Sequence, residues 1–197
     1  MKRYYSIRQE LRNSVVQIKP NKHYGEIERF ICPSSSERLP DDVVFDVIKG
    51  KKWMDIIYYF EAASEKFFSQ RFIDILSAQG IDMTSYCYPI KINGYENINY
   101  YVMYNLRKYE NINPDCLLDD FGEPSYFHIP NNESYIPGIF SVQGTNMKII
   151  NEETMLVLQK NRVTNVRFKE VYALSSAECA EWKKLHAQNK AMLPNIE

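Results

Sequence analysis

The sequence predicts an α+β protein with one domain, in which a mixed or mostly antiparallel sheet packs with two to four helices. Segments rich in β-branched and aromatic residues alternate with a few capped helical segments. The chain has 15 Tyr and 10 Phe among 197 residues, and both types suit half-buried strands. This length, with 45% hydrophobic residues, is enough for one domain with its own core or for two very small ones.

The first part of the chain is the hardest to assign. The segment at residues 6–18 has a mixed periodicity that fits an opening strand or a short helix. Residues 32–40 contain two prolines and three serines, which indicates a loop. We therefore expect residues 1–40 to form an N-terminal extension that packs on a main domain at residues 41–174, followed by a C-terminal helix and tail at residues 175–197.

Two strands and the clearest helix follow. Residues 43–48 are apolar and β-branched and are stopped by Gly50, and residues 53–59 are apolar and aromatic. Ser69 can cap a helix, because its hydroxyl accepts a free backbone N–H. Apolar residues then recur at helical spacing until Gly80, which supplies the left-handed stop.

Two more strands are predicted after that helix. Residues 86–92 read as a strand with Pro89 near its middle. Because proline has no N–H for the ladder, this strand should lie at an edge or carry a bulge. Residues 100–104 have the composition most typical of a strand in the chain.

The second half predicts another helix, a strand and a last helix. Asn151 is a good cap for a helix with acids in its first turn, and residues 163–168 then return as a strand. The last helix should run from Ser176 to about residue 189. Ser175 or Ser176 caps it, and Glu178 is placed for a capping box with Ser175.

The two predicted helix, turn and strand segments align without gaps. Residues 69–89 match residues 151–171 at an offset of 82 (151 minus 69), with a cap at the start of each. One explanation is that any helix, turn and strand resembles another. The other explanation is two similar αβ units, one in each half of a single domain.

Six segments together form a recognisable pattern, namely Phe67–Leu76, Gly80–Ile81, Tyr88–Ile90, Tyr100–Val102, Asn151–Glu153 and Val163–Phe168. This pattern resembles polymorphic-toxin immunity families of bacteria, long catalogued as a domain of unknown function and of the type numbered families eleven and forty-three. The resemblance covers residues 41–174, and Asn165 stands where these families have a glycine. It implies a protein that neutralises a toxin encoded beside it, and it carries over no catalytic residue.

Motifs for catalysis, metal binding and cofactor binding are missing from the sequence. His23, His128 and His186 are scattered, and the four cysteines show no zinc spacing, so we expect reduced and mostly buried thiols. No GxSxG, P-loop or GxGxxG occurs. The sequence thus predicts no enzyme, no metal site and no cofactor, with His128 half-buried or at the surface.

Charge and hydropathy restrict the partners. The net charge is −1, which favours neither nucleic acid nor an anionic membrane. The sequence has no apolar run of membrane-spanning length and no signal-peptide pattern, which predicts a cytoplasmic protein. The oligomeric state stays open.

Residues 109–147 carry the one electrostatic feature. They contain six acids and four prolines but no Lys or Arg, which predicts short strands joined by exposed turns. An acidic and aromatic surface can cover the basic cleft of a toxin that acts on nucleic acid. The predicted anchors for such a partner are Asp119, Asp120, Phe121, Glu123 and Tyr126.

These observations predict a toxin-neutralising immunity protein that works by binding. Two alternatives remain, namely an accessory protein that binds a small ligand or a non-toxin partner, and an enzyme of unrecognised type. An enzyme should show a pocket with converging polar groups and a strongly shifted pKa.

Overall fold

The structure is a computed structural model and describes residues 3–10, 12–33, 35–60, 65–112, 126–130, 133 and 136–192, with side chains as far as residue 184. It confirms an α+β protein. The single sheet that the sequence predicted is in fact two barrel-like sheets, and the described residues form five helices where two to four were expected.

One sheet is a closed barrel of six strands in the order β1-β12-β11-β9-β10-β13. It closes because β13 pairs with two neighbours: its first part lies antiparallel to β1, and its last three residues lie parallel to β10. The strands are β1 (Tyr4–Gln9), β9 (Lys108–Asn111), β10 (Tyr126–His128), β11 (Ile139–Val142), β12 (Lys148–Asn151) and β13 (Val166–Leu174).

The other sheet has seven strands in the order β6-β8-β5-β4-β2-β3-β7 and is nearly closed. Its two end strands, β6 and β7, are consecutive in the chain and are separated by Ile90 alone. Pro89 ends β6 at the edge of the order, as its missing N–H predicted. The strands are β2 (Gln17–Pro20), β3 (Val44–Lys49), β4 (Ile56–Tyr59), β5 (Lys66–Ser69), β6 (Cys87–Pro89), β7 (Lys91–Ile92) and β8 (Tyr100–Met103).

Three helices begin where the sequence predicted caps. Ser69 accepts the N–H of Phe72 at the start of α2, Asn151 accepts that of Thr154 at the start of α4, and Ser175 lies at the start of α5. The other two were not predicted: α1 is capped by His23, a residue outside the usual capping types, and α3 has no side-chain cap. The helices are α1 (Tyr24–Ile31), α2 (Gln70–Ser77), α3 (Met83–Tyr86), α4 (Glu152–Lys160) and α5 (Ser176–Met192).

The two sheets repeat one pattern of strand pairing. In each, two antiparallel strands (β4 and β5, or β11 and β12) lead straight into a helix, α2 or α4. Each first strand has a parallel neighbour, β2 or β9, which in turn pairs antiparallel with β3 or β10. Each second strand pairs antiparallel with β8 or β1, which then pairs antiparallel with β6 or β13. The correspondence thus extends well beyond the 21 residues aligned by sequence.

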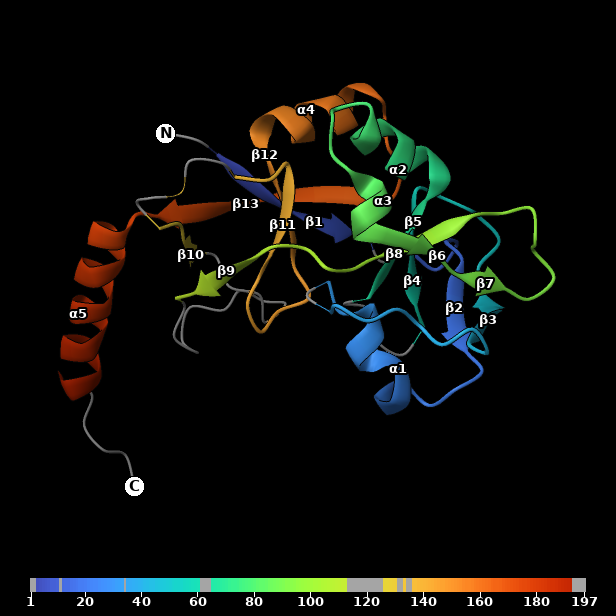
Figure 1. The fold of residues 1–197 in the computed structure, drawn as a ribbon, viewed down its shortest axis with the longest axis horizontal. Helices are drawn as coiled ribbons and strands as arrows, with labels where there is room; N and C mark the ends of the chain where they lie inside the picture. Colours follow the sequence, from blue (N-terminus) through green and yellow to red (C-terminus); the bar gives the residue numbers. More distant parts are fainter. Residues whose placement is uncertain are drawn as a thin grey trace.

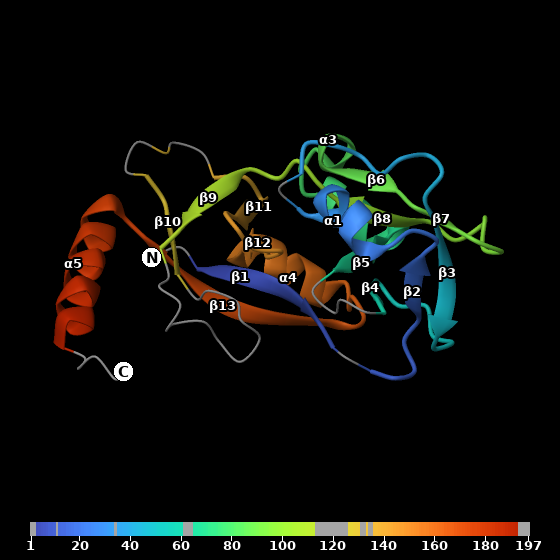
Figure 2. The ribbon, with the colours of Figure 1, turned by 90° about the horizontal axis from the view of Figure 1, so that it is seen from below.

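Strand β1 breaks the chain order of this pattern. By its neighbours β12 and β13 it occupies the position that β8 holds in the other sheet, although it comes from the N-terminus. Residues 1–40, which we expected to be an extension, therefore supply a barrel strand as well as β2 and α1. Figure 2 shows β1 lying along β13.

A buried apolar layer joins the two sheets. It takes Ile56 and Phe68 from the seven-stranded sheet and Ile7 and Ile150 from the six-stranded barrel, together with buried residues of α2 and α4. These two helices lie against each other over this layer (Figure 1). At the far end of the six-stranded barrel, α5 extends away from the seven-stranded sheet (Figures 1 and 2).

Candidate functional site

The predicted partner-binding residues are only partly described. Asp119, Asp120, Phe121 and Glu123 lie outside the described residues. Tyr126 is the first residue of β10 and is half-buried. The described part of the acidic segment does form short strands, β9 to β11, as predicted.

Tyr126 belongs to an aromatic cluster that we define as Tyr126, Tyr172 and Trp182. In the parallel pair of β10 and β13, Tyr126 and Tyr172 are register partners, and their ring centroids lie 5.5 Å apart. The ring of Trp182, from α5, lies 6.0 Å from that of Tyr126. Tyr172 is 48% exposed, so the cluster presents aromatic surface to solvent.

This cluster lies where the connection between β9 and β10, the middle part of the acidic segment, returns to the barrel. The chain leaves β9 at Asn111 and returns at Tyr126, the start of β10, and these two strands are paired in the barrel. The connection between them carries the four predicted anchors that are not described. Both of its ends are therefore fixed near the aromatic cluster.

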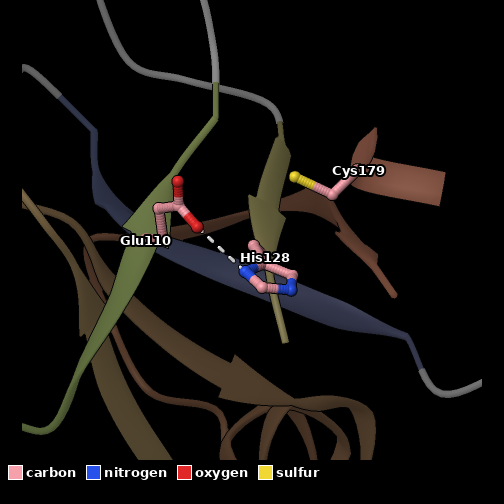
Figure 3. A group of neighbouring side chains, drawn as sticks. All are labelled: Glu110, His128 and Cys179. Atoms are coloured by element: carbon pink, nitrogen blue, oxygen red, sulfur yellow. Dashed lines mark hydrogen bonds and ion pairs between the residues drawn. The ribbon is translucent and has the colours of Figure 1, made fainter. Parts of the chain in front are cut away.

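A polar cluster adjoins the aromatic cluster, and we call the place where β9, β10 and α5 meet the corner. We define the polar cluster as Glu110, His128, Ser176, Cys179 and Lys183. His128 Nδ1 lies 2.9 Å from Glu110 Oε2, and His128 Nε2 lies 3.0 Å from Ser176 Oγ. Lys183 Nζ donates to Glu110 Oε1 over 2.8 Å. Figure 3 shows Glu110, His128 and Cys179 directed toward one another from β9, β10 and α5.

Strand register and helix periodicity bring these side chains together. His128 and Glu110 are directly opposite each other in the antiparallel pair of β10 and β9. Ser176, Cys179 and Lys183 are three and four residues apart along α5, so they share one face of the helix.

The start of α5 is held by the capping box that the sequence predicted. The backbone N–H of Ser175 donates to Glu178 Oε2 over 2.8 Å, and the N–H of Glu178 donates to Ser175 Oγ over 3.4 Å. Helix α5 thus begins directly after β13. Its first residue, Ser176, lies beside His128.

In the polar cluster, the carboxylate of Glu110 and the ammonium of Lys183 each favour the charged form of the other. The hydrogen bond from Lys183, and then that with His128, lowers the pKa of the Glu110 carboxyl below its ordinary value. The hydrogen bond between Lys183 and Glu110 also raises the pKa of the Lys183 ammonium. Glu110 is thus an anion with a cation already beside it.

The contacts from Ser176 to His128 to Glu110 resemble the proton relay of a serine hydrolase. In that relay the acid stays charged and stabilises the imidazolium that forms during the reaction. Here the ammonium of Lys183 bonds to the same carboxylate and offsets its charge. The corner is therefore poorly suited to that relay, and holding a cation between Glu110 and Cys179 suits it better.

Sequence reasoning missed the polar cluster. Glu110, His128 and Cys179 lie in three separate elements and show no metal-ligand spacing in the chain. The usable signal was weak: a pair of short strands with one potential metal ligand in each, and polar residues on one helix face. Only the pairing of β9 with β10 turns these into neighbours.

Two other polar features lie away from this corner. An open groove between α2 and α4 is lined by Gln70, Arg71 and Asp74 of α2 and by Val157 of α4, among others. The second feature is the buried carboxylate of Glu65, which accepts a hydrogen bond from Tyr24. Glu65 also accepts a hydrogen bond from the side chain of Asn146, near the end of the segment at residues 109–147.

The described thiols and histidines agree with the sequence-based expectations. Cys87 and Cys179 are free and buried thiols, and Cys32 is half-buried. His128 is half-buried, with 17% of its side chain exposed. His23 lies at the surface and caps α1.

Comparison with models of protein families gave no match, and neither did comparison with curated proteins. Among the described residues, every helix is too short or too polar to cross a membrane.

Proposed function

We propose that this protein neutralises a cognate bacterial toxin by binding it, and that the aromatic cluster and the adjoining acidic segment form the binding surface. The observation that carries the proposal is the position of Tyr126, Tyr172 and Trp182 at the point where that segment rejoins the barrel. Tyr and Trp are the residue types that most often dominate binding energy at protein interfaces.

Charge supports the same surface. The segment at residues 109–147 contains acids but no Lys or Arg, and four of its acids lie between β9 and Tyr126. Acids near exposed aromatic rings complement a basic cleft of the kind that contacts nucleic acid. The partner that fits this surface best is therefore a toxin that acts on nucleic acid.

The proposal is tested with the products of the reading frames next to this gene. Each is expressed in a bacterial host alone and together with this protein. We expect one product to stop growth and the parent protein to restore it. Tyr172→Ala and Trp182→Ala should weaken binding of that product by about tenfold or more, as hot-spot truncations do.

Tyr95→Ala is the matched control, because Tyr95 is 38% exposed and lies in the seven-stranded sheet's β7–β8 connection. It should leave growth rescue unchanged. Failure of every neighbouring product to bind would favour the alternative of an accessory protein, for which the groove between α2 and α4 is the place to look.

A further inference from the structure

We propose that Glu110, His128 and Cys179 form a zinc-binding site that fastens α5 to the six-stranded barrel. The three residues offer a carboxylate oxygen, an imidazole nitrogen and a sulfur atom that all lie within 4.8 Å of one another. Zinc is the metal that these three ligand types hold most often in proteins.

The distances fit a site that tightens slightly on binding. Zinc bonds of about 2.0–2.3 Å in a tetrahedron place the ligand atoms roughly 3.3–3.7 Å apart. The Glu110 and His128 atoms, 2.9 Å apart, would separate a little, and the thiol would move inward by about 1 Å. Glu110 is 46% exposed and has room to rotate. The fourth position is left for a water molecule.

The surroundings of His128 suit a ligand that binds through Nδ1. A ligating histidine almost always uses its other nitrogen to bond a polar partner, which fixes the tautomer and the ring. Here Nε2 lies 3.0 Å from the hydroxyl of Ser176. In the metal-free state Nδ1 donates to the Glu110 carboxylate. When zinc binds, the imidazole would switch tautomer, so that Nε2–H donates to Ser176 Oγ and Nδ1 offers its lone pair to the metal.

When zinc is absent, the ammonium of Lys183 supplies the positive charge that the metal would otherwise bring. Its ammonium bonds to Glu110, one of the three ligands. Half of its side chain is exposed (52%), so it can swing into solvent when the metal enters. Binding would move the Lys183 ammonium outward, and Cys179 would bind the metal as a thiolate.

Lys183 therefore gives the proposal a variant that should gain affinity. Removing the competing ammonium with Lys183→Met leaves the three ligands and takes away the cation that opposes the metal. Removing a ligand with His128→Ala or Cys179→Ser should have the opposite effect. A network that only holds the helix in place predicts no gain from Lys183→Met.

The experiment is a titration of the chelator-treated full chain with zinc chloride, in competition with a zinc-sensitive dye. We expect one zinc per parent chain, at least tenfold weaker binding by His128→Ala and Cys179→Ser, and several-fold tighter binding by Lys183→Met. The matched controls are His23→Ala and Cys32→Ser, which change the same residue types away from the site and should bind as the parent does.

Cobalt gives a second readout that does not depend on affinity. The parent with bound Co²⁺ should show a thiolate-to-metal charge-transfer absorption, and Cys179→Ser should lack it. Should a ligand variant fail to fold, as judged by circular dichroism, Glu110→Gln at the exposed ligand replaces it. The proposal is overturned if the parent binds zinc no more tightly than the ligand variants, or if cobalt gives no thiolate band.

Discussion

At the scale of single residues, Asp55 holds the two halves of the chain together. It is 5% exposed and lies just before β4. Its carboxylate accepts hydrogen bonds from Ser69 over 2.9 Å, from Arg71 over 2.6 Å and from the backbone of Thr164 over 2.7 Å. It thus bridges the start of α2 and the segment that leads into β13.

Replacing Asp55 with alanine should destabilise the fold strongly. The change leaves several donors without their acceptor, and each buried donor left unsatisfied typically costs about 1–3 kcal/mol. Urea unfolding at neutral pH measures the loss. The control is Asp42→Ala, whose side chain is 64% exposed and pairs with Lys22, and which should unfold much like the parent. Equal losses from the two variants would contradict the bridging role of Asp55.

Glu65 gives a pH-dependent prediction. Burial raises the pKa of its carboxyl above the ordinary 4.5, against the opposing pull of Lys148 and Lys66. One of its oxygens accepts from Tyr24, and the other has no hydrogen-bond partner among the described residues. A raised pKa in the folded state means that stability is complete below about pH 4.5 and falls as pH rises through the folded value.

Glu65→Gln removes this titration. Its free energy of unfolding should therefore improve relative to the parent as pH is raised from about 4 to 8. Urea titrations at several pH values measure the difference between the two proteins. A difference that moves in the parent's favour with rising pH would mean that the lysines hold Glu65 ionised and that burial does not raise its pKa.

At the scale of elements, the sequence was most informative where a local signal decides the structure. Ser69, Asn151 and the box of Ser175 and Glu178 marked three helix starts correctly. Asn165, which stands where the sequence resemblance led us to expect glycine, has a φ of 58° and so adopts the left-handed conformation that glycine favours. Helix α1 was missed because its cap is a histidine.

Strand pairing was the part that the sequence did not predict. Strands of two to four residues carry too little alternation to choose a neighbour, so one sheet was expected where there are two. The same holds for the candidate site, where a local feature was predicted and the contacts that depend on strand pairing were not. Tyr126 was identified from composition, whereas its contacts with Tyr172 and Trp182 depend on the register of β10 and the docking of α5.

The turn after β3 offers a test of element packing. Gly50 has a φ of 79°, and a Cβ at this position would lie 2.0 Å from the carbonyl oxygen of Val15. Gly94 has a similar φ of 73° with nothing near its Cβ position. Alanine at Gly94 should cost only the conformational strain, about 1–2 kcal/mol.

Gly50→Ala should lower the free energy of unfolding clearly more than Gly94→Ala, because Val15 must also move away from the turn to make room for the new Cβ. Thermal unfolding of the two variants side by side measures the difference. Similar midpoints for both would show that the close contact between the turn and Val15 does not form.

At the scale of the whole molecule, the matching strand pairs indicate two copies of one barrel unit. The unit comprising β2 to β8 is continuous in the chain, whereas the unit comprising β9 to β13 takes its last strand, β1, from the N-terminus. The equivalent helices α2 and α4 meet where the units join (Figure 1). This arrangement makes β1 essential to the second unit.

Deleting residues 1–10 should therefore abolish cooperative unfolding. Without β1, strands β12 and β13 lose a shared neighbour and leave two open edges, which favour aggregation. Circular dichroism during heating and size-exclusion chromatography measure the effect. A monomer that still unfolds in one sharp transition would mean that the first residues are an extension after all.

The central claim, binding of a toxin through the acidic and aromatic corner, is tested most directly by the kinetics of association with the purified toxin. We expect Asp119→Lys and Asp120→Lys to slow association and weaken its dependence on salt, since complementary charge speeds encounter. Tyr172→Ala should mainly speed dissociation. If all three variants associate and dissociate as the parent does, this corner is not the binding surface.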